Sequence, residues 1–178
     1  MSWKEKVILT QRSVSAIQTL FRYNWLIRER WYEWCKEVPH EELIRERTGG
    51  VGSILKTLYH IVDVEWSWMQ DMQGKSFPHR SFDNFNTLAA IRQLDQELHE
   101  DVETFVNAWD DSMNRRALRD TELDGSISVY AWGEVMRHVI AHEIHHIGQL
   151  SIWSRELGRP PVSANLIRNA LILPEEAK

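Results

Sequence analysis

Apolar residues recur at intervals of three and four in four long stretches of the chain, the spacing of one face of an α-helix. The pattern predicts helices over residues 10–37, 51–72, 87–109 and 130–157. Pro39, Gly74 and Gly158 end three of them, because Pro lacks an amide hydrogen and Gly often terminates helices. Four helices of this length predict an all-α fold, a four-helix bundle with one shared core.

The connecting segments predict smaller elements. A helical turn is expected at 41–46, a polar loop at 75–86, and a small hairpin around the turn signal Asp124-Gly125. An amphipathic tail at 163–173 is expected to pack back across the bundle. No linker and no repeat period divides the chain, so residues 1–178 are expected to form a single domain.

Composition narrows the classes of partner. The 178 residues carry a net charge of -5 and no block of like charges, which argues against binding to nucleic acid or to an anionic membrane surface. No apolar run approaches the roughly 20 residues that span a bilayer, and the first ten residues do not resemble a signal peptide. The single cysteine, Cys35, is interpreted as a packing residue. A cytoplasmic protein is expected.

Four of the eight histidines lie on the last long helix, at His138, His142, His145 and His146. At about 100° per residue they share an arc of about 100°, which also contains Gln149. A bundle helix should be apolar on such a face, and four buried imidazoles would each lose hydration unless paired or ligated. The stripe therefore predicts a metal site.

The same stripe contains the H-E-x-x-H pattern of zinc peptidases, formed by His142, Glu143 and His146. One peptidase class needs a glycine and a third histidine further along, but Gln149 and Ile152 stand there. The other class needs a glutamate on a following helix, and no suitable one is present. Peptidase activity is therefore not expected.

Spacing alone leaves the ligand pair open, because His138 with His142 is as good a pair as His142 with His146. A third ligand must come from another helix. His60 is the best candidate, since it lies close to the apolar face of the second helix. The remaining histidines lie in an acidic helix or beside prolines and suit ligation less: His99, His40 and His79.

Three segments together resemble the signature of the DinB-like (damage-inducible, YfiT-like) proteins. They are WGEV at 132–135 followed by HVIAHEIHHIGQL at 138–150, GSILKTLYHI at 52–61, and FRYNW at 21–25. Their order and spacing agree over about residues 10–158. The segment from the last helix is fairly specific, and the other two are moderately so.

The resemblance implies an up-down-down-up four-helix bundle, usually a homodimer, with a divalent metal ion, most often zinc or nickel. Carried over by position, the ligands would be His60, His142 and His146. This chain departs from the family at Ile147, where many members have an arginine, so a role of that arginine in substrate or dimer contacts does not carry over.

Three functions follow as hypotheses. Characterised members of the family include metal-dependent thiol transferases that use bacillithiol or mycothiol, so an S-transferase acting on small electrophiles is the leading one. A three-histidine zinc ion keeps an open coordination position, which a thiol or a water molecule can take. The alternatives are a metal-dependent hydrolase of a small substrate and a non-catalytic bundle in which the metal only joins two helices.

The roles of the neighbouring side chains stay open at this point. Glu143 and His138 are candidates for a general base or for a partner of a ligand, while Glu143 is equally well explained as a surface residue on the helix flank. His145 and Gln149 either line the pocket or form hydrogen bonds between helices. Five tryptophans either wall an apolar pocket near the metal or pack in the core and a dimer interface: Trp25, Trp31, Trp34, Trp66 and Trp68.

Overall fold

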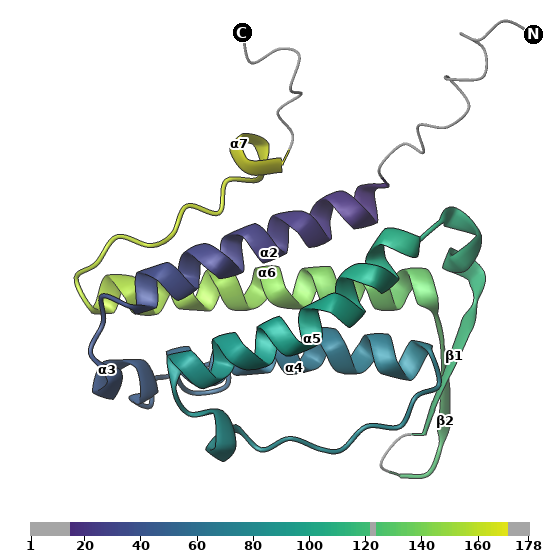
Figure 1. The fold of residues 1–178 in the computed structure, drawn as a ribbon, viewed down its shortest axis with the longest axis horizontal. Coiled ribbons are helices and arrows are strands. Elements are labelled where there is room, and N and C mark those ends of the chain that lie inside the picture. The colour runs from purple at the N-terminus through teal and green to yellow at the C-terminus, as the bar shows by residue number, and fades with distance from the viewer. Residues whose placement is uncertain (1–14, 122–123, 171–178) are drawn as a thin grey trace, which may run out of the picture.

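The computed structural model describes residues 15–121 and 124–170, and this part of the chain is mostly helical. Figure 1 shows four long helices that lie alongside one another: α2 (Ala16–Cys35), α4 (Ile54–Met72), α5 (Leu88–Ala108) and α6 (Trp132–Glu156). Shorter elements connect them: α3 (His40–Ile44), the 3-10 turns η1 (Phe82–Phe85) and η2 (Asp111–Arg115), strands β1 (Ala117–Thr121) and β2 (Ile127–Ala131), and α7 (Leu166–Ala170). The predicted all-α class is consistent with this content.

Capping side chains determine where three of the long helices begin. Ser15, Ser53 and Thr87 each accept a hydrogen bond from an amide in the first turn, and the Gln18 side chain completes a capping box with Ser15. The second and third helices therefore start one to three residues later than the periodicity predicts. The predicted start of the first helix near residue 10 lies outside the described residues.

The start of α6 differs from the prediction for a different reason. Residues 130 and 131 belong to β2, where Tyr130 pairs with Leu118 and Ala131 with Ala117 in an antiparallel ladder. The helix accordingly begins at Trp132. The predicted small hairpin is confirmed, and its second strand runs directly into the histidine-bearing helix.

The core lies between the four long helices. Helix α4 contacts α5 and α6, and α2 contacts the same two helices. The largest fully buried apolar side chains include Phe21, Trp31, Leu58 and Met69. Among the described helices, none is both long and apolar enough to cross a lipid bilayer.

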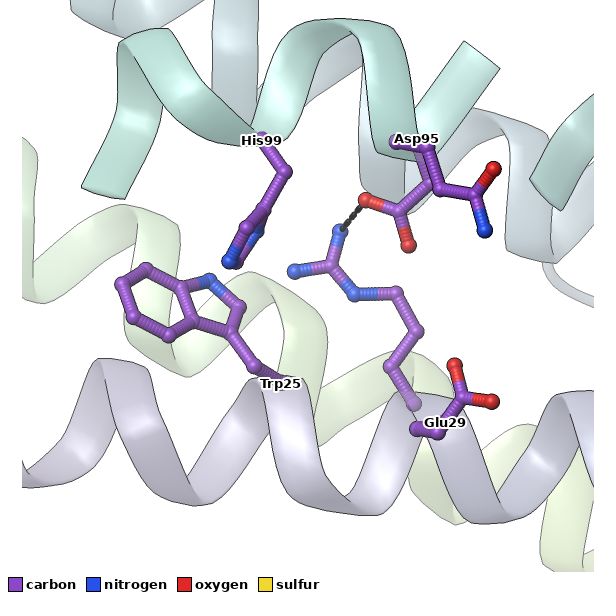
Figure 2. Close-up of a pocket in the computed structure, with 6 residues that line it drawn as sticks. Trp25, Glu29, Asp95 and His99 are labelled. Atoms are coloured by element: carbon purple, nitrogen blue, oxygen red, sulfur yellow. Dashed lines mark hydrogen bonds and ion pairs between the residues drawn. The ribbon is translucent and has the colours of Figure 1, made fainter. Parts of the chain in front are cut away.

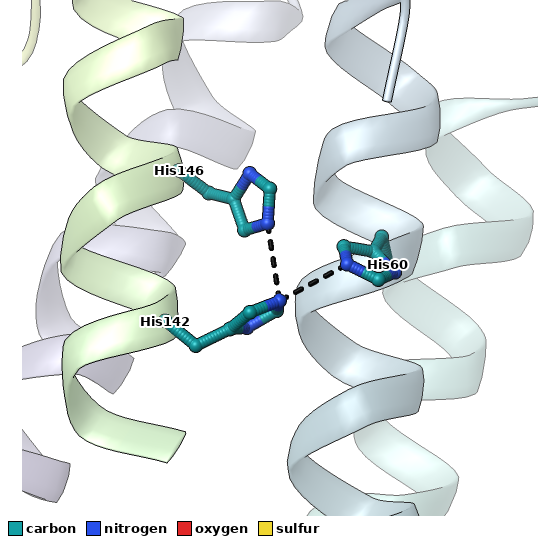
Figure 3. A group of neighbouring side chains, drawn as sticks. All are labelled: His60, His142 and His146. Atoms are coloured by element: carbon teal, nitrogen blue, oxygen red, sulfur yellow. Dashed lines mark hydrogen bonds between the residues drawn. The ribbon is translucent and has the colours of Figure 1, made fainter. Parts of the chain in front are cut away.

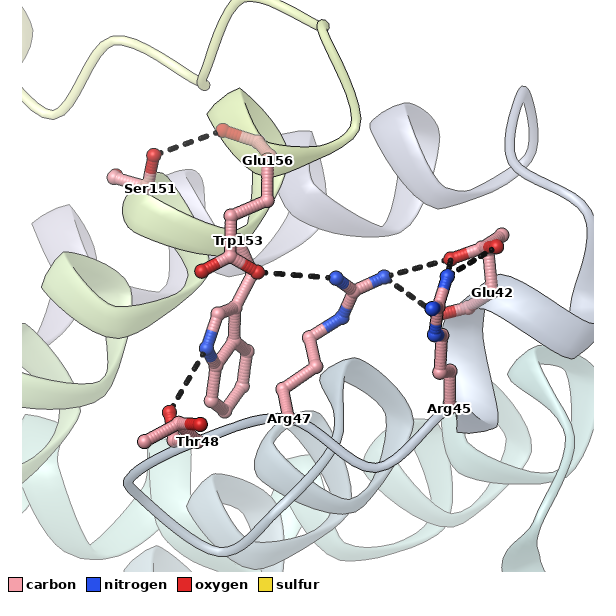
Figure 4. Close-up of polar contacts among 8 residues, drawn as sticks. Glu42, Arg45, Arg47, Thr48, Ser151, Trp153 and Glu156 are labelled. Carbon is pink, nitrogen blue, oxygen red and sulfur yellow. Dashed lines mark hydrogen bonds and ion pairs between the residues drawn. The ribbon is translucent and has the colours of Figure 1, made fainter.

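The loop between α3 and α4 is tied to the end of α6 (Figure 4). The Arg47 guanidinium contacts Glu42 at 3.0 Å and Glu156 at 3.2 Å. The Trp153 indole N–H donates to the Thr48 carbonyl at 3.3 Å. These contacts hold the glycine-containing segment before α4 against α6, close to the histidine stripe.

Candidate metal centre

Three of the predicted site residues meet between α4 and α6. Figure 3 shows His60 on α4 facing His142 and His146, which lie one turn apart on α6. The Nε2 atom of His142 is 3.0 Å from that of His60 and 3.1 Å from that of His146. The ligand atoms of all three lie within 4.8 Å of one another.

This geometry fits a divalent metal ion. Two imidazole nitrogens bound to one zinc ion at the tetrahedral angle lie about 3.3 Å apart, close to the two short distances observed. Burial is the main cause that lowers the pKa of His60 to about 4 and of His142 to about 3, and it also lowers the pKa of His146. The imidazoles are therefore uncharged at neutral pH, as metal ligands must be.

A second set of hydrogen bonds orients His146. Its Nδ1–H donates to the Gln149 side-chain oxygen at 2.8 Å, and the Gln149 amide nitrogen donates to His145 Nε2 at 2.9 Å. The proton on Nδ1 leaves the Nε2 lone pair of His146 directed at the other two histidines. His145 and Gln149 are thus joined by hydrogen bonds within α6, and not by the bonds between helices that were expected.

Gly50 makes room for this arrangement. Its backbone has φ of +57°, and a Cβ atom there would lie 2.5 Å from the Gln149 side-chain oxygen. Neighbouring Gly49 has φ of +85° and open space around the same position. The loop before α4 thus holds a residue without a side chain directly against the group that orients a histidine of the centre.

Within residues 15–121 and 124–170, the group contains three potential ligands and no fourth His, Cys, Asp or Glu. His146 is 5% exposed, whereas His60 and His142 are half-buried. Structural zinc sites usually have four protein ligands, and catalytic ones have three plus an open position. The described residues thus offer three ligands to a metal ion, two of them half-buried.

His138 lies one turn before His142 on the same face of α6, but it is not part of the three-histidine group. Its ring centroid is 6.0 Å from that of His142, and the side chain is exposed. Trp68 of α4 packs edge-on against it at 5.8 Å. His138 is therefore beside the centre, and its proposed catalytic role stays a prediction.

Glu143 contacts α2 and is not part of the three-histidine group. Its side chain is 1% exposed, and one carboxylate oxygen is 3.3 Å from Arg28 Nε of α2. Burial raises the pKa of this carboxyl, although the Arg28 charge opposes the rise. Among the described residues, no hydrogen bond joins it to the three histidines. The alternative of a surface residue on the helix flank is wrong, because the carboxylate is buried against Arg28 in the core, and the catalytic role considered for Glu143 stays a prediction.

The sequence reasoning missed Arg28, which is 2% exposed and contacts carboxylates on three other helices. Besides Glu143, it pairs with Glu65 of α4 at 2.8 Å and Asp95 of α5 at 3.4 Å. The sequence pattern does indicate that Arg28 is buried, because its neighbours at helical spacing on the first helix are aromatic: Phe21, Trp25 and Tyr32. A charge in an apolar stripe indicates a buried ion pair.

A cavity of about 340 Å³ lies between α2 and α5, and Arg28 forms part of its wall. Figure 2 shows Trp25, Glu29, Asp95 and His99 around it. None of the three clustered histidines lines this cavity, so it is separate from the candidate metal centre.

The tryptophans divide between the two roles considered for them. Trp31 is fully buried in the core, and Trp66 is buried beneath the Arg80 guanidinium, 4.1 Å from its ring. Trp34 packs against the chain after α6, where its indole N–H donates to the Pro160 carbonyl at 3.0 Å. Trp68 lines a cavity together with His138.

Two comparisons with known proteins show the family of the chain. The sequence matches the DinB family over residues 6–176. It is also 40% identical over 151 residues to the uncharacterized protein YizA of Bacillus subtilis (strain 168), an alignment that covers 85% of this chain and 94% of that protein. The family match includes both helices that carry the clustered histidines, and the chain belongs to the DinB family.

Proposed function

We propose that His60, His142 and His146 bind one divalent metal ion, zinc or nickel, and that the protein is a metal-dependent thiol S-transferase acting on small electrophiles. The observation that carries the proposal is the convergence of three uncharged imidazole nitrogens within 4.8 Å at a half-buried position. A divalent metal ion bound there supplies a Lewis acid that lowers the pKa of a coordinated thiol or water molecule.

In the proposed reaction, a carbon–sulfur bond forms between a low-molecular-weight thiol and an electrophile R–X. The C–X bond breaks, X leaves with the electron pair as an anion, and the thiol proton passes to a base or to solvent. His138 is the better placed of the two candidate bases, since it is exposed beside His142. Glu143 supports the centre indirectly, because its contact with Arg28 holds α6 against α2.

The metal site is tested by metal content. Purified protein loaded with zinc or nickel should hold one equivalent, and His60→Ala should lose it, because two ligands on one helix bind far more weakly than three. His99→Ala is the matched control, a histidine of α5 outside the group. Elemental analysis after dialysis measures the result, and full retention of metal by His60→Ala would exclude the proposed ligand set.

The transferase reaction is tested by the loss of free thiol. With monochlorobimane as electrophile, thiol consumption should require metal, stop after chelation and resume on metal addition. His60→Ala should lack this rate, and His99→Ala should retain it. Bacillithiol, glutathione and cysteine should be compared, and a rate equal to that without protein for all three would reject the transferase.

A metal-dependent hydrolase is the second candidate, since the same open position can take water instead of a thiol. Metal-dependent cleavage of small esters or amides without thiol consumption would support it. A non-catalytic site is the third candidate. It predicts that metal raises the melting temperature while neither reaction occurs.

We also propose the up-down-down-up bundle and the homodimer that are expected for the family. The long connection between α4 and α5 supports the topology, because a parallel neighbour requires the chain to return along the helix. Sedimentation equilibrium tests the homodimer, and the mass of a single chain would contradict it.

A further inference from the structure

A cavity of about 270 Å³ lies where α4, β2 and the start of α6 meet. It is lined by Trp68 from α4, Tyr130 from β2, and Glu134, Val135 and His138 from α6. Tyr130 lies edge-on to Trp68, with ring centroids 6.4 Å apart. The cavity is small, since pockets for drug-sized ligands begin near about 300 Å³.

The cavity lies next to the candidate metal centre. His138 forms part of its wall, and the His138 ring is 6.0 Å from that of His142. Trp68 follows His60 by two turns on α4, and its ring lies edge-on to that of His138, 5.8 Å away. One end of a molecule in the cavity would therefore contact His138, the lining residue whose ring lies next to His142.

The lining selects for an uncharged apolar group. Trp68, Tyr130 and Val135 supply aromatic and aliphatic surface. Glu134 contributes a carboxylate to the lining, but it is exposed and paired with Arg137 at 2.6 Å. Among the residues that the structure describes, no lysine or arginine lines the cavity, so the carboxylates of a polar thiol would lack a partner there.

We infer that this cavity binds the flat, apolar part of the electrophile, a group of the size of a substituted benzene ring. Edge-on aromatic contacts and removal of apolar surface from water stabilise such a ring. The reaction that follows binding rests on the proposed function. In it, the carbon attached to the ring forms a bond to the thiol sulfur, its bond to X breaks, and X leaves with the electron pair. The binding site itself does not depend on that reaction.

Binding is measured with 4-fluorobenzyl alcohol, an unreactive ring compound whose fluorine resonance broadens on binding to protein. Wild-type protein should bind it, with or without metal, at least tenfold more tightly than 2-fluoroethanol. Trp68→Ala should weaken ring binding about tenfold or more. Trp34→Ala, which removes another half-buried tryptophan far along the chain from the cavity, should leave binding unchanged.

Circular dichroism confirms that each variant is folded, and Trp68→Leu provides an apolar replacement should Trp68→Ala unfold. Equal ring binding in wild type and in a folded Trp68 variant would overturn the inference. Ring binding that depends on Trp68 in a protein that consumes no thiol supports the site and rejects only the transferase. Thiol transfer whose KM for benzyl electrophiles is unchanged in Trp68→Ala overturns the site and keeps the transferase.

Discussion

Single residues decide whether the centre can hold a cation. His60 and His142 keep their lone pairs because burial lowers their pKa values to about 4 and about 3. Gln149 then orients His146 by accepting a hydrogen bond from its Nδ1–H, which leaves the lone pair on Nε2. The sequence predicted the three histidines as ligand candidates. The Gln149 bond could not be predicted, because a glutamine on the same face of the helix can adopt several rotamers.

Cys35 illustrates the opposite case, a reactive group kept inert. Burial raises the pKa of its thiol to about 12, above the ordinary value of 9.0, so the thiol stays protonated throughout the usual pH range. Because the pKa of the Cys35 thiol is higher in the folded chain than in the unfolded chain, ionisation of the thiol favours unfolding. The contribution of Cys35 to the free energy of unfolding is therefore fully present below about pH 9 and is lost as the pH rises toward about 12.

We therefore expect Cys35 in folded protein to react with Ellman's reagent at pH 8 at least a hundredfold more slowly than in guanidinium. Release of thionitrobenzoate measures both rates. Rapid stoichiometric release from the folded protein would contradict the buried position. The outcome also determines whether the protein's own thiol contributes to thiol-transfer assays.

At the scale of elements, the centre requires that the turn of α4 that carries His60 lies beside the turns of α6 that carry His142 and His146. The periodicity predicted both helices but not which turns face each other. The structure places His60 at the level of His142 and His146, and Trp68 at the level of His138. The loop before α4 contributes through Gly50, which packs against Gln149.

Gly50→Ala should weaken metal binding about 10–100-fold, because the new Cβ displaces the Gln149 oxygen from His146 and ligand partners contribute on that scale. Gly49→Ala is the matched control, since its φ is also positive but its Cβ would meet open space. Both should lose similar stability from backbone strain. Competition with a chromophoric chelator measures affinity, and equal affinities for the two variants would disprove the role of Gly50.

At the scale of the whole molecule, Arg28 joins the four long helices. It belongs to α2 and contacts carboxylates of α4, α5 and α6 at 2.8, 3.4 and 3.3 Å. Two of these partners, Glu65 and Glu143, lie on the helices that carry the clustered histidines. The same buried contacts that stabilise the core thus also hold the two halves of the centre together.

Arg28→Met should lower the free energy of unfolding by about 3–5 kcal/mol, because it leaves buried carboxylates without a cation. Arg22→Met removes an exposed arginine of the same helix and should change it by less than about 0.5 kcal/mol. Urea denaturation followed by circular dichroism measures both. A loss below about 1 kcal/mol for Arg28→Met would show that the buried pairs contribute little net stability.

The sequence by itself determined the four long helices and the histidine stripe, because helical periodicity depends only on spacing along the chain. It also carried the family signature. The tertiary structure decided which histidines meet, that Glu143 contacts Arg28, and that Trp68, of the tryptophans in the described part of the chain, borders the cavity beside His138. These outcomes depend on which faces and which turns of the helices pack together. Packing and buried charge pairs between residues far apart in the chain determine that arrangement.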